Sequence, residues 1–254
     1  MTKVIMHGCN GKMGRMITEI IATDPEIEIV AGIDASDHIQ NTYPVFQNIA
    51  DCDVAADVVI DFCVAAAIDG LLDYCVEKQI PCVLCTTGLS EAQLAHVEEA
   101  SKSVAVLRSA NMSLGINLLL VFLKEFAQVL MPAGFDVEIV EKHHNLKVDA
   151  PSGTALALAD TINEELENKY EYVYDRSQTR TKRTDKEIGI SSVRGGTIVG
   201  DHDVIFAGED EVVTISHRAY SKALFAKGAV SAAKFMKGMP AGRYDMHDVI
   251  RKMI

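Results

Sequence analysis

The chain has 254 residues, of which 24 are Lys or Arg and 36 are Asp or Glu, so its formal charge is −12. Apolar residues make up 48% and charged residues 24%, which is ordinary for a folded protein and excludes disordered and collagen-like architectures. The negative charge argues against nucleic acid or an anionic membrane surface as the main partner. An anionic small molecule is compatible with it, because such a ligand responds to the local potential.

The charge is distributed unevenly along the chain. Residues 1–113 hold 16 acidic and 6 basic side chains, whereas residues 114–254 hold 20 and 18. A domain boundary near residue 113 would explain this difference. We expect no signal peptide and no membrane span, because every apolar stretch is shorter than the roughly 20 residues that a span requires.

All six cysteines lie in the first 85 residues of the chain. Without a targeting segment, we expect a cytoplasmic protein with free and mostly buried thiols. Cys82 and Cys85 have C-x-x-C spacing, which is also found in redox and zinc sites. Structural thiols are favoured, because no second Cys/His pair follows at zinc-finger spacing.

The first half of the chain alternates short apolar runs with helical patterns. Strands are predicted at 4–6, 27–33, 56–62, 81–85 and 104–107. Helices are predicted at 13–23, 66–78, 91–101 and 114–130. Strands separated by helices pair in parallel, so the sequence predicts an α/β fold with a Rossmann-like, doubly wound parallel sheet.

The pattern changes in the second half. A strand at 135–141 and a helix at 152–167 precede three strands that no helix separates, at 189–193, 203–207 and 211–217. This order predicts a smaller α+β domain with a largely antiparallel or mixed sheet. A last helix at 222–237 returns to the first domain, so we expect domains of residues 1–113 with 223–254, and of residues 114–222. The basic segment 170–186 is predicted to be a solvated or subunit-contacting loop rather than a nucleic-acid arm.

A glycine-rich turn joins the first strand to the first helix. Its glycines let the backbone pass close to a pyrophosphate, and the helix N-terminus supplies amide donors. Asp34 ends the next strand, 20 residues after Gly14, where a carboxylate can bind both ribose hydroxyls. Together these features favour a dinucleotide site over an ordinary turn. Its predicted residues are Gly8, Cys9, Asn10, Gly11, Lys12, Met13 and Asp34.

Asp34 also bears on the choice of cofactor. Its carboxylate repels a 2′-phosphate, and the next residue is Ala35 rather than an arginine. We therefore expect NADH to serve at least as well as NADPH. Two loops at the carboxyl ends of the fourth and fifth strands are predicted to contact the nicotinamide end, since open α/β sheets bind ligands there. Their residues are Cys85, Thr86, Thr87, Ser109, Ala110, Asn111 and Met112.

The densest group of reactive side chains lies between residues 141 and 155, in the sequence EKHHNLKVDAPSGTA. Ser152, Gly153 and Thr154 are the first residues of the predicted helix. Their backbone amides, with the hydroxyls of the serine and the threonine, form a cradle suited to a carboxylate. Lys147 and two upstream histidines can supply charge and protons beside such an anion. A metal site is disfavoured, because no H-E-x-x-H spacing or third ligand is present.

This fifteen-residue stretch resembles the signature of the 4-hydroxy-tetrahydrodipicolinate (dihydrodipicolinate) reductase family. The resemblance extends over almost the whole chain, through the glycine turn, Asp61-Phe62 and the Thr86-Thr87-Gly88 turn. It implies reduction of a cyclic dicarboxylate by a nicotinamide cofactor in diaminopimelate and lysine synthesis. It also implies a homotetramer assembled through the second domain.

The resemblance further implies a role for each residue of the stretch. His143 becomes the proton donor and acceptor, and Lys147 becomes a proton donor. His144, Gly153 and Thr154 become substrate contacts, with Ser152 in the same cradle. Two alternatives remain, namely another two-domain NAD(P)-dependent dehydrogenase and a non-catalytic dinucleotide sensor. A sensor needs neither His143 nor Lys147, so the enzyme is favoured.

Overall fold

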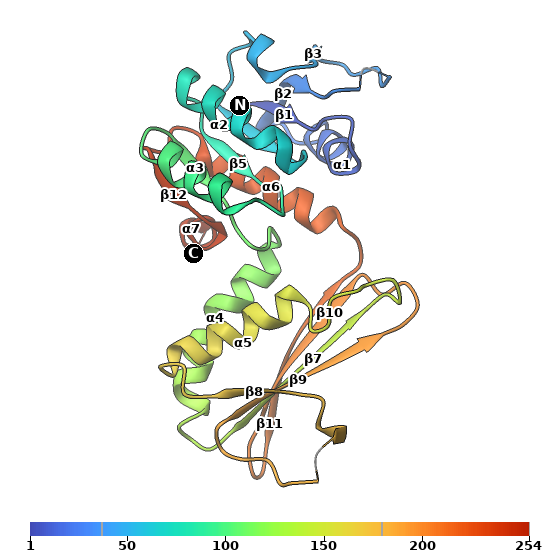
Figure 1. Cartoon of the computed structure of the whole chain (residues 1–254), viewed down its shortest axis with the longest axis vertical. Helices are drawn as coiled ribbons and strands as arrows, with labels where there is room; N and C mark the ends of the chain where they lie inside the picture. The colour runs from blue at the N-terminus through green and yellow to red at the C-terminus, as the bar shows by residue number, and fades with distance from the viewer. Residues whose placement is uncertain (37, 179, 254) are drawn as a thin grey trace. The chain divides into compact units, whose positions relative to one another are not determined.

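The computed structural model describes residues 1–36, 38–178 and 180–253, which form two compact units (Figure 1). Unit 1 consists of Met1–Leu114 with Ala223–Ile254, and unit 2 consists of Gly115–Lys222. None of the helices within the described residues is long and apolar enough to cross a membrane.

Unit 1 is built on a seven-stranded sheet in which all neighbouring strands are parallel, in the order β12-β6-β5-β4-β1-β2-β3. The order reverses at β1, which is the topological switch point of a doubly wound fold. The prediction of a Rossmann-like sheet is therefore confirmed. The strands are β1 (Thr2–His7), β2 (Ile27–Ile33), β3 (Val45–Phe46), β4 (Val58–Asp61), β5 (Cys82–Leu84), β6 (Ala105–Leu107) and β12 (Gly242–Tyr244).

Helices cover both faces of this sheet, because each face carries an apolar row from the strands. One core joins Val4, Met6 and Ile60 to buried residues of α1 and α6, and the other joins Ile5 and Val59 to those of α2 and α3. The elements are α1 (Lys12–Ile21), η1 (Ile49–Asp51), η2 (Ala65–Ala67), α2 (Ile68–Lys78), α3 (Glu91–Ser101), α6 (Ala223–Met236) and α7 (Met246–Met253).

Unit 2 is a mixed five-stranded sheet in the order β11-β10-β7-β9-β8, with two helices on one face (Figure 1). β11, β10 and β7 pair in antiparallel fashion, and β7, β9 and β8 pair in parallel. The elements are α4 (Leu114–Leu130), β7 (Asp136–His143), α5 (Gly153–Glu165), β8 (Glu171–Tyr174), η3 (Arg176–Gln178), β9 (Glu187–Arg194), β10 (Gly200–Ala207) and β11 (Val212–Ala219). The core lies between the helices and the alternate strand residues that face them.

The predicted loop at 170–186 is partly wrong. Glu171–Tyr174 forms the edge strand β8, paired in parallel with β9. Its arginines are used within unit 2: Arg183 donates to the carbonyl oxygens of Val137 and Glu187 at 2.9 and 2.8 Å, and Arg176 pairs with Glu187. The short strands β3 and β12 and the helix α7 are further elements that the pattern did not predict.

Candidate functional site

Strand register brings four polar residues from three strands to the helix-facing side of the unit 2 sheet. Glu141 and His143 are two residues apart on β7, so their side chains lie on the same face. The register pairs Glu141 with His202 of β10, and His143 with Arg194 of β9. The result is a polar cluster at one end of a face that is otherwise apolar.

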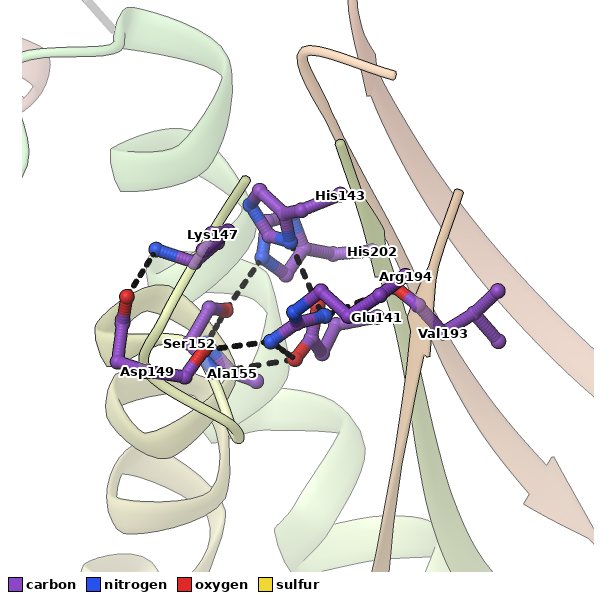
Figure 2. Close-up of polar contacts among 9 residues, drawn as sticks. All are labelled: Glu141, His143, Lys147, Asp149, Ser152, Ala155, Val193, Arg194 and His202. Atoms are coloured by element: carbon purple, nitrogen blue, oxygen red, sulfur yellow. Dashed lines mark hydrogen bonds and ion pairs between the residues drawn. The ribbon is translucent and has the colours of Figure 1, made fainter. Parts of the chain in front are cut away.

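The carboxylate of Glu141 is the centre of this cluster, as Figure 2 shows. It is fully buried, and Arg194 donates to it through two N–H groups, Nη1 to Oε2 at 2.8 Å and Nη2 to Oε1 at 2.7 Å. His143 Nδ1 lies 2.6 Å from Oε2, and the Ser152 amide donates to Oε1 at 3.1 Å. Such a bidentate arginine contact is a strong and directional form of ion pair.

These contacts set the charge of Glu141. Burial opposes the charged form, but hydrogen bonds from Arg194, Ser192 and His143 outweigh it and lower the pKa of Glu141 to about 2. A permanently charged acceptor at Nδ1 favours the His143 tautomer with its proton on that nitrogen. Nε2 is then the atom of His143 that can exchange a proton.

The Nε2 atom faces Gly200 at the start of β10. A Cβ atom built on Gly200 would lie 3.0 Å from Nε2, so the nitrogen packs closely against the Gly200 backbone and a side chain there would crowd it. His143 itself is only 8% exposed. The ring is thus largely buried, with Nδ1 at Glu141 and Nε2 beside Gly200.

A second buried histidine, His202, contacts the same cluster. Its Nε2 lies 3.0 Å from the Ser152 hydroxyl, and its ring meets the His143 ring edge to face with centroids 5.2 Å apart. Burial and the neighbouring His143 lower the pKa of His202 to about 4. His202 is therefore neutral at physiological pH and adds no positive charge beside His143.

The helix α5 begins where the sequence predicts an anion cradle. Ser152 is its N-cap and accepts the Ala155 amide at 3.1 Å. The expectation that Ser152 offers free donors is wrong, because its amide binds Glu141 and its hydroxyl contacts His202. Gly153 is exposed and Thr154 half-buried in the first turn, where the helix dipole favours an anion.

Lys147 lies in the loop between β7 and α5. Its ammonium forms an ion pair with Asp149 Oδ1 at 2.8 Å (Figure 2). The pair lowers the pKa of that carboxyl, and Asp149 is largely exposed. Arg194 Nη2 also donates to the Asp149 carbonyl oxygen at 2.6 Å, so this loop is tied to the Glu141 cluster. His144 is half-buried at the start of the loop.

In unit 1 the glycine turn lies against the carboxyl ends of β1 and β4. Gly8 has φ +82°, and a Cβ there would lie 2.5 Å from the Phe62 carbonyl oxygen. A Cβ on Gly14 would lie 2.2 Å from the Gly8 carbonyl oxygen, so the helix α1 can approach the turn only without a side chain. A tight turn and a close helix are the two roles that glycines have in dinucleotide-binding turns.

Asp34 lies beside this turn. Its Oδ2 accepts the Asn10 amide at 2.9 Å, and its Oδ1 accepts the Ser36 amide at 3.0 Å. Each carboxylate oxygen keeps a second acceptor position for a ribose hydroxyl. The N-cap of α1 is Gly11, which has no side chain to occupy the first amides of the helix. The turn, the helix end and Asp34 therefore fit a nicotinamide dinucleotide.

Two of the predicted cofactor contacts, Cys9 and Met112, have side chains in the core of unit 1. The Cys9 side chain is fully buried in the core, and burial raises the pKa of its thiol to about 11. Met112 is 5% exposed in the same core, and a Cβ on Gly228 of α6 would lie 1.6 Å from the Met112 carbonyl oxygen. Only the backbone of these two residues can contact a cofactor.

The remaining predicted cofactor residues lie at the ends of β5, β6 and the glycine turn. Thr86 is buried and donates its hydroxyl to Asp61 Oδ2 at 2.6 Å, whereas Thr87 is exposed. The others are exposed or half-buried, and they are Lys12, Met13, Cys85, Ser109, Ala110 and Asn111. Cys85 and Cys82 are free thiols with raised pKa values, through burial at Cys85 and through the hydrogen bond with Cys75 and then burial at Cys82. Inert structural cysteines behave in this way.

Three residues of these sites gain importance only in the structure. His7 lies in none of the motifs, whereas Arg194, in the Val193-Arg194-Gly195-Gly196 run, is part of the family resemblance without an assigned role. Glu141 belongs to the 141–155 motif, also without a role of its own. His7 forms a buried ion pair with Asp61, whose register partner it is, and Arg194 reaches Glu141 across the sheet. A prediction of which residues pair between neighbouring strands could have found both pairs. Within the described residues, no group of three or more His, Cys, Asp or Glu side chains is arranged to hold a metal.

A parallel sheet with a glycine turn, joined in sequence to a unit with a buried histidine–carboxylate site, is typical of two-domain nicotinamide-dependent oxidoreductases. Family models for the N-terminus and the C-terminus of dihydrodipicolinate reductase match residues 2–112 and 115–250. The chain therefore belongs to the dihydrodipicolinate reductase family, and it is an oxidoreductase of diaminopimelate and lysine biosynthesis. The family and its Rossmann-like unit imply a nicotinamide cofactor.

Curated relatives cover the chain from end to end. It is 53% identical over 256 residues to the 4-hydroxy-tetrahydrodipicolinate reductase of Caldanaerobacter subterraneus subsp. tengcongensis, with 99% of each chain covered. It is 52% identical over 246 residues to that of Clostridium tetani, covering 97% of this chain and 96% of the relative. A solved structure of dipicolinate-bound dihydrodipicolinate reductase from Paenisporosarcina sp. TG-14 shares the fold, with a TM-score of 0.80, 24% identity and coverage of 98% and 99%.

Proposed function

We propose that this chain reduces 4-hydroxy-tetrahydrodipicolinate to tetrahydrodipicolinate, and that His143 and Lys147 manage the protons. The conclusion rests above all on one observation, the buried Glu141 carboxylate that holds His143 at Nδ1 and is itself neutralised by Arg194. Replacing the ring hydroxyl by hydrogen consumes one hydride and one proton and releases water. The nicotinamide cofactor supplies the hydride, and the chain must supply the proton.

His143 is suited to proton exchange through Nε2. Glu141 keeps the Nδ1 proton in place, so a proton arriving or leaving must use Nε2, the nitrogen beside Gly200. A positively charged His143 is stabilised by Glu141, and a neutral His143 leaves Glu141 still paired with Arg194. The same hydrogen-bonded frame is therefore kept when a proton is added to or removed from Nε2.

Lys147 provides the mobile positive charge. Its ammonium is paired with Asp149, which is exposed and gains little from the contact. A substrate carboxylate can replace Asp149 at this ammonium without leaving a buried charge unpaired. Lys147 can then neutralise the substrate and donate a proton beside His143.

The second substrate carboxylate fits the first turn of α5. Gly153 and Thr154 contribute the helix N-terminus, and Ser152 acts through its N-cap contacts rather than as a free donor. His144, half-buried one residue after His143, is the remaining proposed contact. The dipicolinate-bound state of the Paenisporosarcina protein supports a cyclic dicarboxylate as the ligand class.

For the cofactor we propose the edge formed by residues 8–13, Asp34, residues 85–87 and residues 109–112, with NADH used at least as well as NADPH. Asp34 carries the argument, because its carboxylate lies beside the turn and repels a 2′-phosphate. Steady-state kinetics with both cofactors test the preference. A kcat/KM for NADPH more than about tenfold above that for NADH, roughly 1.4 kcal/mol, would contradict it.

Two broader proposals concern assembly and location. One face of the unit 2 sheet packs on α4 and α5, and the opposite face carries exposed Val193 and Val212. Such a face is suited to packing against another copy, and we propose a homotetramer, which light scattering after size exclusion measures. Six free cysteines fit a reducing cytoplasm, which fractionation of cells followed by immunoblotting tests.

The activity is tested by following NADH oxidation with freshly generated condensation product of aspartate semialdehyde and pyruvate. Wild-type protein is expected to turn over, and His143→Ala to lose about 10²–10⁴-fold in kcat, as removal of a general acid does. Lys147→Ala is expected to lose kcat and to raise KM for the substrate. Lys142→Ala is the matched control, because Lys142 pairs with Asp203 at 2.6 Å on β10 and takes no part in the site. Turnover like that of the wild type in both site variants would overturn the assignment.

A further inference from the structure

A buried ion pair lies at the carboxyl ends of β1 and β4. His7 is the last residue of β1 and Asp61 the last of β4, and the register places them opposite each other. His7 Nδ1 lies 2.7 Å from Asp61 Oδ1, and the residues are 4% and 0% exposed. Neither takes part in the chemistry proposed for unit 2.

The Asp61 carboxylate holds the loops that follow β4 and β5. Its Oδ2 accepts the Thr86 hydroxyl at 2.6 Å and the Thr86 amide at 3.3 Å. Its Oδ1 accepts the Cys63 amide at 3.2 Å, and that amide also donates to the Thr86 hydroxyl oxygen at 3.1 Å. The loops after β4 and β5 are thereby joined through one carboxylate.

The glycine turn is tied to the same point. His7 immediately precedes Gly8, and the Phe62 amide donates to the His7 carbonyl oxygen at 3.0 Å. A Cβ on Gly8 would lie only 2.5 Å from the Phe62 carbonyl oxygen, so turn and loop are in direct backbone contact. Two segments of the proposed cofactor edge, the glycine turn and the Thr86 loop, therefore meet the loop after β4 at His7 and Asp61.

The charge of the pair explains why a histidine is used. The Thr86 and Cys63 groups that contact Asp61 are a hydroxyl and amides, which carry no formal charge, so His7 provides the counter-charge. Burial disfavours a charged imidazole, but the hydrogen bond and charge of Asp61, with a contribution from Cys63, outweigh it and raise the pKa of His7 to about 9. A buried carboxylate without a counter-charge is costly and perturbs its surroundings.

We propose that His7 and Asp61 are positioning residues for the dinucleotide: the pair holds the glycine turn and the Thr86 loop in one arrangement, and the imidazolium cancels a carboxylate charge beneath the cofactor's phosphates. The inference rests on the proposed cofactor edge. It predicts that His7 acts on cofactor affinity and leaves the proton chemistry of unit 2 unchanged.

The test compares NADH binding and kinetics in His7→Leu, His7→Asn and His7→Leu/Asp61→Asn. His7→Leu is expected to weaken NADH binding, measured by fluorescence titration, at least tenfold, while kcat at saturating NADH changes less than threefold. The Asn side chain keeps a donor near the Nδ1 position, so His7→Asn is expected to recover part of the affinity. The double variant removes the uncompensated charge and is expected to bind NADH more tightly than His7→Leu, a coupling that a double-mutant cycle measures.

His96→Leu is the matched control. His96 Nδ1 also pairs with an aspartate, Asp69, at 2.8 Å, but on the surface of α3. Its removal is expected to leave NADH affinity unchanged. A folded His7→Leu or His7→Asn that binds NADH as the wild type does would overturn the inference. Failure of the wild type itself to bind NADH would instead overturn the proposed cofactor site.

Discussion

Each unit of this molecule buries a histidine against a carboxylate, yet the two carboxylates are neutralised in different ways. His7 Nδ1 lies 2.7 Å from Asp61 in unit 1, and His143 Nδ1 lies 2.6 Å from Glu141 in unit 2, and both carboxylates are fully buried. Asp61 has His7 as its counter-charge among neutral donors. Glu141 has Arg194, which binds it through two N–H groups.

The difference decides what each histidine can do. His7 cannot lose its proton without leaving a buried negative charge unpaired, which is a costly state. In unit 2, Arg194 does not titrate in the physiological range and keeps Glu141 neutralised whatever the charge of His143. One pair of residue types is therefore a fixed structural contact in unit 1, and in unit 2 it is compatible with the proton exchange that we propose for His143. The third residue, rather than the histidine or the acid, makes the distinction.

The largest effect is expected when Arg194 is removed. Arg194→Met leaves the buried Glu141 carboxylate without its permanent partner and is expected to destabilise unit 2 by about 3–5 kcal/mol. Denaturant unfolding, monitored by hydrogen exchange at the backbone amides of residues 115–222, measures this loss of unfolding free energy. Arg218→Met is the control, since Arg218 is largely exposed where it pairs with Asp201 at 3.0 Å, and should cost at most about 1 kcal/mol. Equal losses in the two variants would mean that burial of Glu141 is not the source of the effect.

A somewhat smaller effect is expected in unit 1 at alkaline pH. The folded-state pKa of His7, about 9, lies above the unfolded value of 6.5, so the pair's contribution is complete below about pH 6.5. It is lost as the pH rises through 9, for a total on the order of 3 kcal/mol. Melting curves between pH 7 and pH 10 measure the decline. His7→Asn has no such titration, and a decline as steep as that of the wild type would exclude His7 as its cause.

The smallest effect is expected from Glu141→Gln, which keeps the shape of the side chain and removes its charge. The amide can still accept at Nδ1 of His143 through its oxygen, but it no longer stabilises the charged imidazole. We expect kcat to fall about tenfold, roughly 1.4 kcal/mol, and its pH profile to shift, because the charged form of His143 becomes less favourable. Asp203→Asn, at the Lys142 pair on the same sheet, should leave that profile unchanged. An unshifted pH profile of kcat in Glu141→Gln would mean that His143 is not the group whose titration limits turnover.

Local patterns predicted most of the architecture. β2, α3 and α4 have the bounds that the apolar periodicity indicates, because each is a regular element with clear ends. β8 was not predicted because it is a four-residue edge strand in a polar and basic segment. Its pairing with β9 cannot be inferred from the local sequence pattern. Edge strands often have such polar character.

The sites divide in the same way. The glycine turn and the 141–155 stretch are local motifs, so their residues could be named from the sequence. His7 lies 54 residues from Asp61 and Arg194 lies 53 from Glu141, and only the register of the sheets brings these partners together. The Ser152 hydroxyl could be taken for a substrate donor, because the sequence cannot show that this hydroxyl already accepts the Ala155 amide and contacts His202.

Gly200 also matters for this site, because it has no Cβ atom. A single methyl group there would lie 3.0 Å from His143 Nε2, and the Glu141 contact leaves the ring little freedom to move away. Gly200 has no side chain and therefore no interaction that a substitution could remove. It nevertheless sets how closely the backbone packs on that nitrogen. An alanine at this position would crowd Nε2, so the molecule would retain every polar group of the site and yet be obstructed at the atom proposed for proton transfer.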